Sequence, residues 1–343
     1  MKAGKTILGL GVRGLTMPGL AILGLAVSGV VHAQDTIRVL APTWVGFAPA
    51  LVAGDLGYYE EEGLEVDFRF EDDRANVLAA MERGDIDADM RTVGEHQGAP
   101  RTDDTPGIII GTIDLSLGGD GVLVDGSIDS VADLQGKLVA IEPNIPARLL
   151  LQMELKKAGL SLDDVELRQI ATADTIAVLS DDSISAVGTY EPFLSQALTA
   201  VAERNPKILV SSKDEPDLII DIITAREDDL AENPAKYQKF LRGIYRAVDY
   251  FQQDPKSFAA LAAPHYGLSA DEVTEIIDTS LAYTSYEQSL EFLGTPDAPG
   301  TLYGFFDQIM ELNIEFGASE VTLDAAKEID AAVLTGLFDG AAR

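Results

Sequence analysis

The residue types that could carry covalent or metal chemistry are scarce in this chain. It contains no Cys, which removes thiol catalysis and thiolate metal sites, and no two of its three His residues have metal-ligand spacing. The segment Asp114-Leu-Ser116-Leu-Gly118 lacks the first Gly of a nucleophile elbow, and no His is placed to activate Ser116. We therefore expect no catalytic residue, no metal and no cofactor.

Carboxylates are the abundant polar groups. Asp and Glu number 57 against 25 Lys and Arg, which gives a formal net charge of −32 at pH 7. This acidity opposes binding to nucleic acid or anionic membrane surfaces, because both carry the same sign of charge. Most of these acids must belong to a solvated surface, so only acids gathered at one site could define a specific function.

Residues 1–33 have the pattern of a cleavable signal peptide. The segment starts with basic residues and no acid, continues through an apolar run at 20–27, and ends in Val31-His32-Ala33, which suits cleavage before Gln34. Gly and Pro18 interrupt the apolar part and no basic flank follows, which disfavours a membrane anchor. Without Cys the protein cannot be a lipoprotein. We expect a periplasmic mature chain that is not inserted in the membrane.

Strand-like and helix-like segments alternate along the chain, which indicates an α/β fold. Hydrophobic periodicity predicts strands at 36–40, 64–70, 86–90, 139–141, 165–170 and 185–188. It predicts helices at 47–59, 75–83, 147–158, 174–180, 233–253, 271–281, 303–315 and 323–334.

These elements form two similar sets, which predicts two Rossmann-like lobes joined by a hinge that the chain crosses twice. We expect the crossings at 108–118 and 219–225, with ligand bound between lobes that rotate as bodies. The expected division is 34–115 for the first part of lobe 1, 116–221 for lobe 2, and 222–343 for a mainly helical completion of lobe 1.

One stretch resembles a known family. The pattern from Trp44-Val-Gly46 through Gly57-Tyr-Tyr59 to Gly63-Leu-Glu-Val66 is similar to the first unit of the periplasmic solute-binding proteins for nitrate, sulfonates, taurine and thiamine precursors. Segments 131–142, 156–160 and 190–193 look like later blocks of that family in the same order. The resemblance implies a type II periplasmic-binding-protein fold and delivery of a small solute to an ABC permease and its ATPase subunits.

In that architecture the ligand lies at loops after the strand ends. Trp44, the only Trp, would form an apolar wall that can stack on a planar or cationic ligand, as its position in the family implies. Phe47 has a second interpretation as the first core residue of the following helix, and Ser116 would be a hinge hydroxyl. The complete set of expected ligand contacts is Trp44, Phe47, Glu95, Asp114, Ser116, Asp120, Glu142, Asn144 and Glu191.

Two features favour a cationic or zwitterionic ligand over an anionic one. Pro143 and Pro146 lack an N–H, so two potential anion donors are missing near the start of a helix. The five expected acidic contacts would repel one another in a closed cleft, and a bound ammonium or guanidinium would relieve that cost. Arg148, one turn into the helix, could still support an anion.

We therefore expect a monomeric, non-catalytic solute-binding component of an ABC importer that captures a small nitrogen- or sulfur-containing solute. One alternative is a binder of sulfonate, taurine or nitrate within the same family. A second is an enzyme of pyrimidine or thiamine-precursor metabolism on the same scaffold, and a third is a sensor domain that signals to a membrane receptor.

Overall fold

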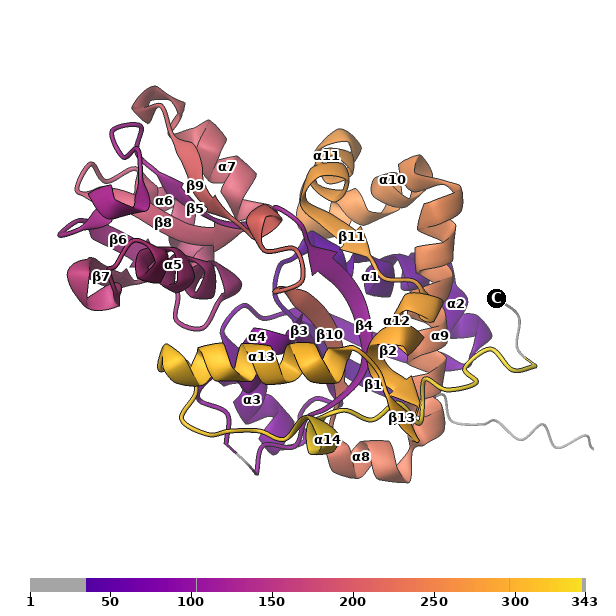
Figure 1. The fold of residues 1–343 in the computed structure, drawn as a ribbon. Coiled ribbons are helices and arrows are strands. Elements are labelled where there is room, and N and C mark those ends of the chain that lie inside the picture. Colours follow the sequence, from indigo (N-terminus) through magenta and orange to yellow (C-terminus); the bar gives the residue numbers. More distant parts are fainter. Residues whose placement is uncertain (1–34, 103, 296, 341–343) are drawn as a thin grey trace, which may run out of the picture. The chain divides into compact units, whose positions relative to one another are not determined.

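A computed structural model describes residues 35–340 of the chain, positions 103 and 296 excepted. The expected signal peptide at 1–33 lies outside the described residues. Within the described part the predicted α/β class is confirmed, because two mixed sheets are each covered by helices (Figure 1). No helix in this part of the chain is long and apolar enough to cross a membrane.

The first sheet begins with the pair predicted from alternating apolar and polar residues. β1 and β2 run in parallel, with Asp35 opposite Leu64 and Ala41 opposite Phe70. β10 is antiparallel to both of its neighbours, β3 and β4. In order across the sheet the strands are β11 (Leu281–Tyr283), β4 (Ile108–Ser116), β10 (Ile220–Ala225), β3 (Ala88–Thr92), β1 (Asp35–Ala41) and β2 (Leu64–Phe70).

The second sheet carries a separate set of helices, and its elements are called the second lobe here; the elements around the first sheet are called the first lobe. Its strands are, in order, β7 (Glu166–Gln169), β6 (Leu138–Ile141), β8 (Ile184–Tyr190), β5 (Asp120–Val124) and β9 (Lys207–Ser211). Side chains alternate between its faces: Val122 belongs to the apolar cluster that includes α5 (Pro146–Lys157), whereas Leu123 belongs to the cluster under α6 (Thr175–Leu179) and α7 (Phe193–Ala200).

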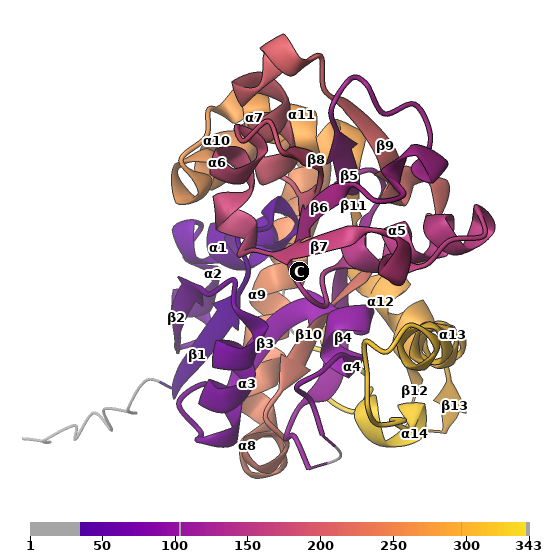
Figure 2. The same ribbon diagram turned by 90° about the vertical axis from the view of Figure 1, so that its left-hand side faces the viewer.

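The helices of the first lobe come from both ends of the chain. The long helix α9 (Pro234–Gln253) packs on α1, β1 and β2 (Figure 2) through fully buried side chains that include Tyr237 and Phe240. The remaining helices are α1 (Ala48–Asp55), α2 (Tyr58–Glu61), α3 (Arg74–Glu82), α4 (Val93–Gln97), α8 (Glu227–Glu232), α10 (Pro255–Tyr266), α11 (Ala270–Ser280), α12 (Tyr286–Leu293), α13 (Leu302–Glu315) and α14 (Ala325–Glu328), with a short hairpin of β12 (Gly294–Thr295) and β13 (Ala298–Pro299).

Two predicted helices differ from the structure. The helix predicted over 47–59 is divided, because Gly57 adopts φ 75° in the left-handed region and begins a new helix, α2. The helix predicted over 323–334 is wrong beyond its first turns: α14 ends at Glu328, and Ile329 forms a β-bridge with Ile109. Pairing with the sheet edge therefore outweighs the helical periodicity there.

The chain passes between the sheets at residues 117–119 and again at 212–219, next to the predicted crossings, which themselves consist mostly of β4 and β10. The Ser212 hydroxyl connects the two passages. Its Oγ lies 2.9 Å from Ser116 Oγ and accepts hydrogen bonds from the backbone N–H of Gly118 at 2.8 Å and of Asp120 at 3.3 Å. One side chain thus connects the end of β4 in the first sheet to the end of β9 in the second sheet.

Candidate functional site

Trp44 lies on the loop after β1, held there by neighbouring tyrosines. Tyr266 and Tyr283 donate hydrogen bonds to the backbone oxygens of Trp44 and Val45, each at 3.0 Å. The indole Nε1 lies 3.2 Å from both carboxylate oxygens of Asp114, and its ring meets Tyr190 edge to face with centroids 6.4 Å apart. Trp44 therefore contacts Tyr190 of the other lobe through its ring and the buried carboxyl group of Asp114 through its N–H.

Asp114 and Asp221 form a buried carboxyl pair behind this wall. They face each other in the register of β4 and β10, and their side chains are within hydrogen-bonding reach of each other. Burial raises the pKa of both groups, and the neighbouring charges of Asp114 and Asp120 raise that of Asp221 further. The shared burial therefore favours a proton on the pair when no cation is near.

Asp120, the first residue of β5, brings a third carboxyl group from the second lobe. Burial, together with the charges of Glu95 and Glu191, raises the pKa of Asp120 to about 7 despite a hydrogen bond from Ser116. Its side chain is 4% exposed, and no Lys or Arg among the described residues is paired with it. Asp120 is thus poised to ionise when a positive charge arrives.

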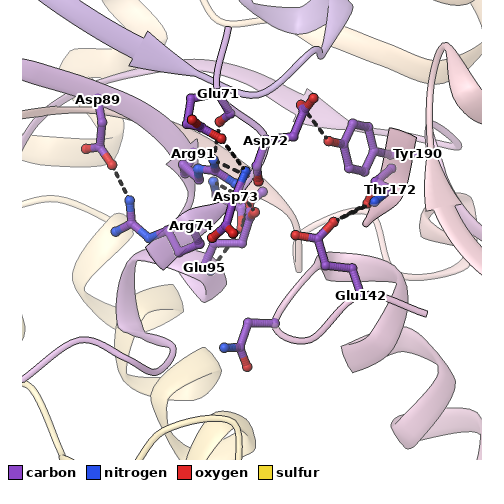
Figure 3. A network of polar contacts seen from close by, with 12 residues as sticks. Glu71, Asp72, Asp73, Arg74, Asp89, Arg91, Glu95, Glu142, Thr172 and Tyr190 are labelled. Carbon is purple, nitrogen blue, oxygen red and sulfur yellow. Dashed lines mark hydrogen bonds and ion pairs between the residues drawn. The ribbon is translucent and has the colours of Figure 1, made fainter. Parts of the chain in front are cut away.

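Glu95 is held in a fixed position by its own helix. Thr92 and Glu95 form a reciprocal capping box at the start of α4, and Glu95 Oε1 lies 3.1 Å from Arg91 Nη1. Arg91 also donates to the backbone oxygens of Glu71 at 2.6 Å and Asp72 at 3.2 Å (Figure 3). Three protein acceptors therefore bind the two Nη groups of Arg91, whereas its buried Nε has no partner among the described residues.

Eight residues from the two lobes line one cavity. Two aromatic rings and three acids contribute to it, and none of the described residues that line it is Lys or Arg. The full lining is Pro42, Trp44, Thr92, Glu95, Asp120, Pro146, Tyr190 and Asp221. We call this space the acidic cavity.

The lobes contact each other beside the acidic cavity. The Tyr190 hydroxyl donates to Asp72 Oδ1 at 3.2 Å, and Asp72 Oδ1 in turn accepts the backbone N–H of Thr43 at 2.7 Å (Figure 3). Asn144, in the left-handed conformation at φ 64°, donates its side-chain amide to the backbone oxygen of Ala99. These bonds join the second lobe to the first when the lobes are close together.

The sequence-predicted contacts divide into three groups. Trp44, Glu95 and Asp120 line the acidic cavity, and Asp114 lies directly behind it. Asn144 lines a neighbouring cavity. The others lie elsewhere: Phe47 is fully buried in the core, Ser116 bonds Ser212 at the hinge, Glu142 accepts from Thr172, and Glu191 accepts from Ser195.

The predicted contacts omit five residues that line the acidic cavity: Pro42, Thr92, Pro146, Tyr190 and Asp221. Asp221 had a recognisable signal, because it is a single acid inside the apolar run Leu218-Ile-Ile-Asp-Ile-Ile223. A lone acid in a buried strand is costly unless it is used. Tyr190 was inside a predicted cleft loop, but nothing in the sequence distinguished its ring from that of a core aromatic.

A model of one protein family matches residues 44–258, and its description is NMT1/THI5 like. The chain belongs to this family. The resemblance stated from the sequence is thereby confirmed. A binding protein from Brucella abortus is 22% identical over 292 residues, covering 84% of this chain and 87% of that protein. The 4-amino-5-hydroxymethyl-2-methylpyrimidine phosphate synthase of Aspergillus parasiticus is 25% identical over 224 residues, covering 61% of this chain and 64% of the enzyme.

Solved structures share the fold. The periplasmic nitrate-binding protein NrtA from Synechocystis PCC 6803 superimposes with a TM-score of 0.71 at 14% identity, covering 89% of each chain. The periplasmic aliphatic sulphonate binding protein SsuA from Escherichia coli gives 0.68 at 18% identity, covering 86% of this chain and 92% of that one. The predicted type II periplasmic-binding-protein fold is confirmed.

Proposed function

We propose that this protein is the extracytoplasmic solute-binding component of an ABC importer and that its solute is a small cationic amine, amidinium or guanidinium. The single observation that carries the cationic assignment is the composition of the acidic cavity. Trp44 and Tyr190 provide π faces, while Glu95, Asp120 and Asp221 provide negative charge in a place largely shielded from water.

The acidic cavity is unfavourable for an anionic ligand. The nearest guanidinium, that of Arg91, already bonds Glu95 and two backbone oxygens. Pro42 and Pro146 line the cavity and have no N–H to donate. A sulfonate or nitrate would therefore meet the carboxylates of Glu95, Asp120 and Asp221, and their repulsion would be strong because solvent screens charges weakly in a buried cavity.

Binding and release would follow from movement of the lobes. The two passages at the hinge allow rotation, and a cation held by Glu95 and Asp221 of the first lobe and Asp120 of the second favours the closed arrangement. The signal-peptide pattern at 1–33 and the periplasmic relatives support export to the periplasm. The closed protein would then deliver its ligand, as a monomer, to the permease and ATPase subunits.

The alternative function is synthesis of a pyrimidine or thiamine precursor. It is supported by the similarity to the synthase of Aspergillus parasiticus. The described His residues do not support it. Burial lowers the pKa of His96 to about 4, and His96 is bonded to Glu328 at 2.9 Å, while His265 bonds Asp55 at 2.7 Å. Neither lines the acidic cavity, which supports the proposal that the protein binds its solute without turning it over.

A thermal-shift screen of residues 34–343 tests this proposal. The panel contains alkylamines, guanidine and amidines on one side, and taurine, alkanesulfonates and nitrate on the other. We expect cations to raise the melting temperature, since a ligand that binds only the folded state stabilises it by about 2.7 kcal/mol at one hundred times its Kd. Stabilisation by nitrate or sulfonate with none by any cation would contradict the assignment.

A further inference from the structure

A second cavity adjoins the acidic cavity. The two share Thr92, Glu95 and Pro146 as lining residues, so they meet along one wall. Beyond the shared wall the second cavity is mainly apolar, with Ile145, Leu149, Leu218, Ile219 and Ala318 in its lining. An aliphatic chain fits such a surface better than a polar ligand does, because contact with it removes apolar area from water.

Arg148 is the cation of this second cavity. It lies in the first turn of α5 and is half-buried, and its guanidinium forms no hydrogen bond or ion pair with any other described residue. Two other cations of the same helix are paired: Lys156 contacts Glu315, and Lys157 lies 2.7 Å from Glu154 and 2.8 Å from Glu215. In a chain with 57 acids, a half-buried guanidinium without a carboxylate is unexpected.

The amide side chains around Arg148 already donate hydrogen bonds to the protein. Gln152 donates to the backbone oxygen of Phe316 at 3.1 Å, Asn313 donates to that of Gly94 at 3.0 Å, and Asn144 donates to that of Ala99. Their hydrogen-bonding groups thus stabilise the protein itself. Arg148 is left as the group in this cavity with a full set of donors for an anionic ligand group.

We propose that the ligand is bipolar: its cationic group occupies the acidic cavity, an aliphatic stem crosses the shared wall at Pro146, and a terminal carboxylate reaches the Arg148 guanidinium. This inference rests on the proposed function and adds the class of solute, an ω-amino carboxylate with separated charges. A planar carboxylate suits a guanidinium because the two can form paired hydrogen bonds. The acids of one cavity and the cation of the other also fix the direction in which the ligand lies.

Calorimetry with matched ligands tests the inference. The probes are 4-aminobutanoate, 6-aminohexanoate and 8-aminooctanoate, each compared with the alkylamine and the alkanoate of the same chain length. We expect at least one amino acid to bind about tenfold or more tightly than its amine, as a charge-assisted pair provides. Arg148→Gln should remove that advantage and leave the affinity for the amine unchanged, whereas Arg168→Gln, a change at an exposed cation of the same lobe, should preserve it.

The possible failures can be distinguished. Equal affinity for amines and amino acids at every length, or an advantage that persists in Arg148→Gln, would overturn the bipolar ligand and leave the cationic site intact. Binding of alkanoates without alkylamines would overturn both the bipolar ligand and the proposed function. A circular-dichroism melt of Arg148→Gln checks that a lost advantage does not come from unfolding.

Discussion

Asp114 and Asp221 face each other across antiparallel strands β4 and β10, both almost completely buried, with their carboxyl groups within hydrogen-bonding reach. Two such groups cannot both be ionised cheaply in a shielded place. The Trp44 indole N–H, 3.2 Å from both oxygens of Asp114, partly compensates the charge that remains. An arriving cation would complete the compensation, so the energy of binding is linked to the protonation of the site.

The affinity for an amine should rise with pH. Asp120 has its pKa raised to about 7 without ligand, and a bound cation lowers the pKa, so binding releases a proton below pH 7. The dissociation constant of butylamine should therefore fall by up to about tenfold per pH unit between pH 5.5 and 7, and should fall further above pH 7 as the Asp114–Asp221 pair loses its proton. Calorimetry in two buffers of different ionisation enthalpy measures the released proton directly; affinity that falls with rising pH would oppose the account.

Asp120→Asn should weaken amine binding and, at high pH, stabilise the ligand-free protein. Without the carboxylate, amine affinity should fall about tenfold to a hundredfold, the value of a charge-assisted hydrogen bond. A carboxyl group whose pKa is raised on folding stabilises the fold below its unfolded pKa and loses that contribution as pH rises through the folded value. The ligand-free variant should therefore melt higher than the parent at pH 8 and similarly at pH 4. Asp182→Asn, at an exposed acid of the same lobe, is the control that should change neither quantity.

Gly46→Ala should disturb the aromatic wall. A Cβ atom at residue 46 would lie 2.1 Å from Trp44 Nε1 and 2.2 Å from Asp114 Oδ2, so one of the two side chains must move. We expect a loss of roughly 1–3 kcal/mol in stability, weaker amine binding and a changed emission from Trp44, the only Trp of the chain. Gly304→Ala, which meets nothing within 4 Å in α13, should instead leave binding unchanged; equal behaviour of the two variants would argue against a packed wall.

Tyr190→Phe should weaken closure while keeping the aromatic ring. The change removes the hydroxyl that donates to Asp72 from the other lobe at 3.2 Å, worth about 1 kcal/mol. Stopped-flow measurements should show ligand dissociation that is several times faster with little change in association. Tyr303→Phe removes a hydroxyl that bonds Ile329 within the first lobe, so its kinetics should match those of the parent.

Sequence reasoning predicted most of the elements because their periodicity was strong. The strand expected over 64–70 matches β2, and the helix expected over 233–253 differs from α9 by one residue. β5 and β9 were not anticipated, since both are short and one is buried throughout and therefore shows no alternation. The division of the chain into lobes at 115/116 and 221/222 remains a prediction. For comparison, β4 ends at Ser116 and β10 begins at Ile220.

The candidate site was less accessible from the sequence. Loops at strand ends identified Trp44, Glu95 and Asp120, because a strand end is a local feature. The same rule selected Glu142 and Glu191, whose carboxylates instead bond hydroxyl groups of their own lobe, at Thr172 and Ser195. Which acids share one cavity depends on how β4 and β10 pair over a long separation in sequence, and no local pattern encodes that.

The most direct test of the cationic cavity is one calorimetric comparison on residues 34–343 at pH 8, with butylamine and butanesulfonate as ligands of equal length and opposite charge. The account predicts saturable heat from butylamine, binding that is about tenfold to a hundredfold weaker in Asp120→Asn, and no heat from butanesulfonate. Saturable binding of butanesulfonate, with no heat from butylamine, would contradict it.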